Sequence, residues 1–210
     1  MNQTWRVYKF RALSDFKHVA DIFHNHRFHT AHFSELNDPM EGRLYHCDKD
    51  TEPRYLDELR QGLDKRRICS FSEEYKNLLL WAHYADGFKG ICIEVELDFW
   101  PDYEIRKVDY FPRGTWPHFS NDLGDYVSSW PTEVLTGKYD VWKYEKEVRV
   151  LTNEEYINHP MCVIKSVLLG TRISLPMKNA IIKLVPQGVK VFDTKISDSS
   201  NTVIKEKRLK

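Results

Sequence analysis

Several features that would point directly to a function are missing from this 210-residue sequence. No apolar run approaches the roughly 20 residues that span a bilayer, and the N-terminus lacks the apolar core of a signal peptide. The four cysteines are widely spaced and include no Cys-x-x-Cys pair, so neither a structural zinc site nor a dithiol redox centre is indicated. We therefore expect a cytoplasmic protein that has no membrane partner and keeps its cysteines reduced.

The common nucleotide-binding motifs and an excess of basic charge are also missing. The chain contains neither Gly-x-Gly-x-x-Gly nor the Gly-x-x-x-x-Gly-Lys-Ser/Thr pattern, so a Rossmann or P-loop domain is not indicated. Lys and Arg together number 31 and are balanced by 31 Asp and Glu. The overall basic charge that is typical of nucleic-acid-binding proteins is therefore absent, although a local basic patch is not excluded.

The composition is that of a folded globular domain. Hydrophobic residues make up 41% of the chain, and 11 Tyr, 11 Phe and 6 Trp argue against disorder. Strand-like and helix-like segments alternate irregularly, which favours an α+β fold over a doubly wound sheet. We expect one catalytic-type domain over residues 1–195, followed by a polar C-terminal arm or final hairpin strand over residues 196–210.

Apolar periodicity predicts the principal elements. Residues 112–140 are expected to hold one or two helices interrupted at Pro131, and Ser14 is expected to cap the first helix of the chain. Strands are predicted over 5–11, 67–72, 90–97, 142–151, 161–170 and 189–196, and helices over 14–26, 53–66, 73–87 and 174–188.

The predicted strand around residues 142–151, "WKYEKEVRVL", has an unusual charged face. In an extended segment Glu145 and Glu147 share one side, with Lys143 and Arg149 flanking them. Alternating charges of this kind form a solvated ladder on many antiparallel sheets. The alternative is a polar cleft in which a fixed carboxylate stabilises positive charge during a reaction.

Two further segments have both a structural and a functional interpretation. In the loop "ELNDPMEG", Asn37 and Asp38 either form a turn before Pro39 or, together with Glu41, project into a binding site. In the helix "WAHYADG", Trp81 and Tyr84 are either core residues or face a ligand, and His83 is either a hydrogen-bonded half-buried residue or a ligand contact.

Metal and serine-hydrolase sites are not favoured. His24, His26, His29 and His32 fall within nine residues but lack the spacing of a zinc motif, so surface and capping roles are preferred and no metal is expected. Ser70 in "CSFS" lacks the glycines of a nucleophile elbow.

Several segments in order resemble a widespread bacterial family described only as a domain of unknown function. The likeness covers nearly the whole chain, and its motifs are "YKFR", "FSELNDPMEG", "ICSFSEEYKNLLLWAHYADGFKGICIEVE", "WKYEKEVRVL" and "LLGTRIS". The resemblance identifies a family pattern and implies no activity of its own.

A second likeness is to ADP-ribosyltransferases of the Arg–Ser–Glu type. Their order of motifs is similar to that of Arg11, the segment Ser70-Phe71-Ser72 and the segment Glu145-Lys146-Glu147, although Phe71 stands where the family has Thr. The resemblance implies a central cleft between mixed or antiparallel sheets with helices packed outside. It also implies that NAD is a substrate.

The same likeness assigns roles to individual residues. Arg11 would hold a phosphate of NAD, Ser70 and Ser72 would brace the nicotinamide-ribose pocket, and Trp81 or Tyr84 would stack on a ring of the nucleotide. Glu147 would stabilise the oxocarbenium-like sugar, and Glu145 would orient or deprotonate the acceptor. The "NDPME" loop and the "WAHYA" helix have no counterpart in the transferase pattern.

The leading hypothesis is an NAD-consuming ADP-ribosyltransferase-like enzyme, such as a toxin or phage-defence effector that modifies nucleic acid or protein. One alternative is a non-catalytic module that binds a nucleotide or nucleic-acid end through Tyr8, Arg11 and Trp81. Another is a metal-dependent nuclease that uses Asp38, Glu41 and the two strand carboxylates. The oligomeric state is left open.

Overall fold

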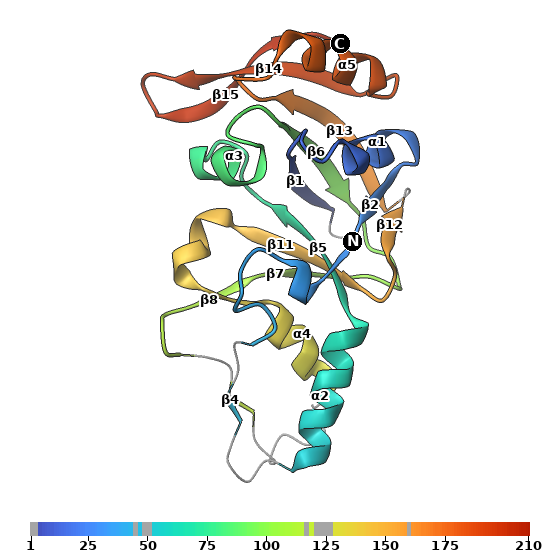
Figure 1. The fold of residues 1–210 in the computed structure, drawn as a ribbon, viewed down its shortest axis with the longest axis vertical. Coiled ribbons are helices and arrows are strands. Elements are labelled where there is room, and N and C mark those ends of the chain that lie inside the picture. Colours follow the sequence, from blue (N-terminus) through green and yellow to red (C-terminus); the bar gives the residue numbers. More distant parts are fainter. Residues whose placement is uncertain (1–3, 44–45, 48–51, 116–117, 120–127, 159–160) are drawn as a thin grey trace.

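The computed structural model describes residues 4–43, 46–47, 52–115, 118–119, 128–158 and 161–210 (Figure 1). Within these residues the chain is built around a nine-stranded mixed sheet with the order β15-β14-β13-β6-β1-β5-β11-β7, and β3 pairs with β5 beside this path. The strands are β1 Trp5–Arg11, β3 Ala31–His32, β5 Arg67–Ser72, β6 Ile91–Leu97, β7 Glu104–Lys107, β11 Glu147–Thr152, β13 Cys162–Leu169, β14 Lys190–Ser197 and β15 Thr202–Arg208.

Shorter elements surround this sheet. Three small ladders join β2 Arg27–His29 to β12 Tyr156–Asn158, β8 Asp109–Phe111 to β10 Gly137–Tyr139, and β4 His46–Cys47 to β9 His118–Phe119. The helices are α1 Phe16–His24, α2 Pro53–Lys65, α3 Leu78–Tyr84, α4 Trp130–Leu135 and α5 Leu175–Leu184, with 3-10 turns η1 Phe33–Glu35 and η3 Asp140–Glu145.

The large sheet consists of two halves that are joined at one point. Strand β1 pairs with β6 along its whole length, and β5 pairs in the same way with β11. Between β1 and β5, in contrast, Tyr8 with Ser72 is the single register pair. Beyond it the two strands diverge, so we distinguish a β1 half-sheet (β15-β14-β13-β6-β1) from a β5 half-sheet (β5-β11-β7 with β3).

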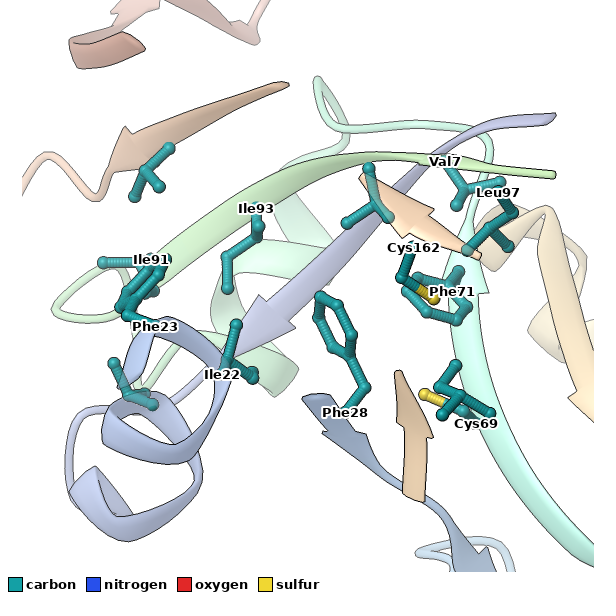
Figure 2. Close-up of a cluster of buried hydrophobic side chains, with 14 of the residues drawn as sticks. Val7, Ile22, Phe23, Phe28, Cys69, Phe71, Ile91, Ile93, Leu97 and Cys162 are labelled. Carbon is teal, nitrogen blue, oxygen red and sulfur yellow. The ribbon is translucent and has the colours of Figure 1, made fainter. Parts of the chain in front are cut away.

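Apolar side chains attach the helices to both halves. The amphipathic α1 buries Ile22 and Phe23 against strands of the β1 half-sheet, near Ile91 and Ile93 (Figure 2). Burying each such side chain contributes about 1.5–3 kcal/mol. Helix α3 packs on the opposite face of β1 (Figure 1), while α2 and α4 cover one end of the β5 half-sheet.

The face of the β5 half-sheet that lies toward α2 and α4 changes from apolar to polar along the strands. Ile68 and Leu151 belong to the apolar cluster beneath these helices. Further along the same face, strand alternation places Ser70 and Ser72 on β5 beside Glu147 and Arg149 on β11. One face of two paired strands is therefore apolar under the helices and polar where the half-sheets separate.

The mixture of helices with a large mixed sheet confirms the coarse expectation of an α+β protein. The predicted first strand is confirmed at Trp5–Arg11, and the C-terminal segment forms a strand, β15, that pairs antiparallel with β14. Helix α3 is shorter than predicted because Asn77 caps it, its side chain accepting a hydrogen bond from the Leu79 N–H.

Three local predictions are wrong. The strand predicted over 142–151 begins only at Glu147, because residues 140–145 form η3 and Lys146 is left-handed with φ of 43°. Ser14 is not the helix cap, since α1 follows Asp15, which makes no side-chain capping bond. Pro131 does not interrupt a helix but lies in the first turn of α4, where a missing N–H costs nothing.

Candidate functional site

A cleft of about 610 Å³ opens where β1 and β5 diverge. Its walls come from β1, β5, β11, α3, Lys138 of β10 and the loop after η1. Most of the residues singled out from the sequence line it, namely Tyr8, Arg11, Asn37, Glu41, Ser70, Ser72, His83, Tyr84, Glu145 and Glu147. Segments that are far apart in the sequence therefore converge on one cavity.

Arg149 organises the floor of the cleft. Its guanidinium is fully buried and binds two carboxylates through pairs of hydrogen bonds. Nη1 and Nη2 lie 2.8 and 2.6 Å from the Glu41 oxygens, and Nε and Nη2 lie 2.8 and 3.0 Å from those of Glu147. The planar fork of arginine matches carboxylate oxygens in this bidentate manner. The loop that carries Glu41 is thereby fixed to β11.

Lys138 is the second buried cation of the network. Its Nζ lies 2.6 Å from Glu145, 3.2 Å from Glu147 and 3.7 Å from Glu41. Despite burial, the charges of Glu147 and Glu145 raise the pKa of Lys138. Three carboxylates face two cations, so the cluster carries one net negative charge when all its members are ionised. We call these five residues the acid–base cluster.

The two neighbouring carboxylates have opposite pKa shifts. Burial opposes ionisation of Glu147, but the charges of Arg149 and Lys138 and a hydrogen bond from Ser70 lower its pKa to about 2. For Glu145, burial and the charge of Glu147 outweigh Lys138 and raise the pKa. One carboxylate is thus held ionised, while its neighbour is a better proton acceptor, a division typical of acid–base sites.

Tyr84 connects the cluster to the "NDPME" loop. Its hydroxyl donates to the Glu145 carboxylate and accepts a hydrogen bond of 3.1 Å from the Asn37 side-chain amide. Burial, followed by the Glu145 charge, raises the pKa of Tyr84, so its hydroxyl stays protonated. The loop, α3 and η3 are joined by this chain of side chains.

The opposite wall of the cleft is cationic. By strand alternation Lys9 and Arg11 leave β1 on the side of Val7, away from Tyr8. Lys9 Nζ donates to the Ser70 carbonyl at 2.6 Å and lies 5.4 Å from the centre of the Phe71 ring. Arg11 Nε is buried without a hydrogen-bond partner among the described residues. The cavity therefore extends through the gap between the half-sheets. Its side formed by the acid–base cluster is anionic, and its side formed by Lys9 and Arg11 is cationic.

The solvated-ladder interpretation of "WKYEKEVRVL" is wrong. Glu145, Glu147 and Arg149 are all buried; Glu147 pairs with Arg149, and Glu145 pairs with Lys138. Because Lys146 adopts the left-handed conformation, η3 ends and β11 begins within one residue. Both glutamates consequently reach Lys138 although only Glu147 belongs to a strand.

Two of the predicted ligand contacts, Trp81 and Asp38, do not line the cleft. Trp81 is fully buried, stands edge-on to Phe10 with 5.3 Å between ring centres, and donates from Nε1 to the Tyr75 carbonyl. It is a core residue. Asp38 is buried in the turn, where its Oδ1 accepts from the Met40 N–H at 2.9 Å, so the turn interpretation of this residue is confirmed.

The histidine group is dispersed. His29 lines the cleft, His24 and His26 are exposed, and His32 caps η1 through its ring nitrogen. Among the residues that the structure describes, no three His, Cys, Asp or Glu side chains form a group that could hold a metal ion.

Two lysines of the cleft, Lys9 and Lys138, are not among the site residues predicted from the sequence. Lys138 lies on a three-residue strand whose sequence carries no recognisable pattern. Lys9 had an available signal, because alternation along the predicted first strand places it on the same side as Arg11.

Comparisons with known proteins assign no function to any residue of the cleft. No family model matches the chain, and no curated protein and no solved structure matches it either. In the described part of the chain, no helix is both long and apolar enough to cross a membrane.

Proposed function

We propose that the cleft binds NAD and cleaves its nicotinamide–ribose bond, so that ADP-ribose is transferred to a macromolecular acceptor. One observation carries the proposal: Arg11, Ser70 and Glu147, which come from three separate strands, line a single cavity. The sequence likeness to Arg–Ser–Glu transferases requires this convergence. The order of the segments along the chain does not by itself produce it.

The electrostatics of the cleft support glycosidic cleavage. As the bond breaks, its electron pair leaves with nicotinamide and positive charge develops on the ribose. The acid–base cluster offers a net negative charge, and Glu147 stays ionised because Arg149 and Lys138 hold its pKa low. A preorganised carboxylate in a site of low polarity is worth more than the same group in water.

Glu145 is the residue we assign to the acceptor. Its raised pKa makes it a better base than an ordinary carboxylate, and Tyr84 fixes its orientation. In the proposed reaction an acceptor hydroxyl or amine attacks the ribose carbon and its proton passes to Glu145. Arg11, on the opposite wall, would bind the diphosphate across the gap between the half-sheets.

Nicotinamide release tests this proposal. Purified protein is incubated with NAD labelled in the adenylate part and with cell extract, and nicotinamide and labelled acceptor are quantified. We expect Glu145→Gln to lower the rate by about 100-fold or more, the usual contribution of a general base. Glu58→Gln, at an exposed position of α2, should retain full activity. Absence of nicotinamide release by the unmodified protein, with nucleic-acid and protein acceptors alike, would overturn the proposal.

One observation favours a non-catalytic nucleotide-binding module as the second candidate. Both oxygens of Glu147 already accept hydrogen bonds from Arg149, and one also contacts Lys138. If the cluster is purely structural, NAD, ADP-ribose or ADP will raise the melting temperature by mass action without nicotinamide release. Glu145→Gln would then leave these shifts unchanged, whereas Arg11→Gln would reduce them.

A further inference from the structure

The cleft contains two lysines with contrasting surroundings. Lys138 lies among three carboxylates, the nearest 2.6 Å away, and these charges keep it protonated. Lys9 forms no ion pair with any carboxylate that the structure describes; its Nζ donates to the Ser70 carbonyl, 2.6 Å away, beside the Phe71 ring. A buried amine without a counter-ion favours its neutral form.

The pKa of Lys9 reflects these surroundings. Burial, assisted by Arg11, lowers the pKa of Lys9 to about 8, while Cys69 and Glu147 act in the opposite direction. At pH 7 roughly one Lys9 side chain in ten is then a free amine, far more than for an ordinary lysine with a pKa of about 10.4. The neutral amine has a lone pair, which is the requirement for a nucleophile.

Arg11 supplies an adjacent anion-binding group. It lies two residues from Lys9 on the same side of β1, a separation of about 7 Å along a strand. Its Nε is buried without a partner among the described residues, and the acidic groups acting on it are the buried Cys69 thiol and, less strongly, the exposed Asp15. An unused buried donor of this kind is suited to a phosphate oxygen.

We propose that Lys9 is a nucleophile that forms an imine with the carbonyl group of a phosphorylated aldehyde or ketone, whose phosphate binds Arg11. The neutral Nζ forms a bond to the carbonyl carbon as the carbon–oxygen π bond breaks, and one proton of the nitrogen passes to the oxygen to give a carbinolamine. The hydroxyl group then leaves as water by taking the second nitrogen proton, and the imine remains. No oxidant or reductant is consumed.

This inference is independent of NAD cleavage. It rests on Lys9 and Arg11 alone, so it stands even if the acid–base cluster proves to be structural. Open-chain ADP-ribose, which has an aldehyde and a diphosphate, and small sugar phosphates belong to the same chemical class of ligand.

Reductive trapping tests the proposal on the intact, unmodified protein. Pyridoxal 5′-phosphate at less than one equivalent is added with borohydride, and labelled lysines are mapped by peptide mass spectrometry. We expect Lys9 to be labelled at least ten times more than the exposed Lys207, and Lys138 to stay unlabelled. Labelling of Lys9 should rise to half its maximum near pH 8. Labelling of Lys9 no greater than that of Lys207 would overturn the proposal.

A ligand pair isolates the role of the phosphate. Pyridoxal, which lacks the phosphate, should label Lys9 at least tenfold less, and Arg11→Gln should reduce labelling by pyridoxal 5′-phosphate to that level. Equal labelling by the two aldehydes would overturn the assignment of Arg11. Protection of Lys9 by ADP-ribose, but not by a sugar phosphate, would identify the dinucleotide product as the preferred source of the carbonyl; the reverse result would identify the sugar phosphate.

Discussion

Replacement of Glu147 by Gln tests the electrostatic account of the cleft most directly. The carboxylate is buried between Arg149 and Lys138, and no other group on β11 replaces its charge. Glutamine keeps the size of the side chain but removes the charge and turns an amide donor toward two cations. We expect the variant to fold, because the apolar clusters are untouched, and to be clearly less stable.

The size of the effect follows from the pKa of Glu147. Its fall from the ordinary value of 4.5 to about 2 corresponds to about 3 kcal/mol of stabilisation by the ionised form. For a chain of this length that is a decrease in melting temperature of about 6–12 °C. Because the pKa is lowered in the folded state, this stabilisation is complete above pH 4.5 and is lost as the pH falls toward 2.

Urea denaturation followed by tryptophan fluorescence measures this difference, since Trp81 and Trp130 are buried reporters. At pH 7 the free energy of unfolding should be about 3 kcal/mol lower in Glu147→Gln. At pH 3 less than half of that gap should remain, because the unmodified protein has lost most of the charge effect. A gap below about 1 kcal/mol at pH 7, or one that does not change with pH, would refute the reasoning.

Three further variants probe neighbouring features. Arg149→Met leaves two buried carboxylates without their principal cation and should cost about 3–5 kcal/mol in urea denaturation, whereas Met at the exposed Lys143 should cost almost nothing. Glu145→Gln should leave stability at pH 7 unchanged or slightly increased, because a raised pKa makes the ionised carboxylate unfavourable in the folded state; a large loss measured by differential scanning calorimetry would contradict this sign. Gly90→Ala would place a Cβ 2.3 Å from the Arg11 carbonyl, so we expect a lower melting temperature and weaker labelling of Lys9; unchanged values would show that β1 can shift freely.

The strands and the convergence of the cleft were accessible from the sequence to different degrees. Trp5–Arg11 and Ile91–Leu97 were predictable because their apolar residues follow a strand pattern. That Arg11, Ser70 and Glu147 line one cleft was predictable only through the likeness to a known family. Periodicity describes one segment at a time and does not say which segments become neighbours.

The errors have local physical causes. The charged stretch was predicted as one strand because Glu145 and Glu147 are compatible with period-two alternation, but a left-handed Lys146 has no sequence signature comparable to glycine. The sequence is compatible with Trp81 as a ligand contact, because the helical pattern does not show which face of this helix packs against the core. No sequence pattern identifies Lys138, because its role depends entirely on tertiary contacts.

The single register pair between β1 and β5 has a consequence for motion within the native state. Each half-sheet has its own continuous backbone hydrogen bonds, so the two are expected to open as separate cooperative units, as hydrogen exchange reveals in other proteins. A ligand that contacts Arg11 on one strand and Ser70 on the other would replace the missing rungs of the ladder. Its binding should slow amide exchange in both strands together, because the bound ligand would hold the two half-sheets to each other across the cavity.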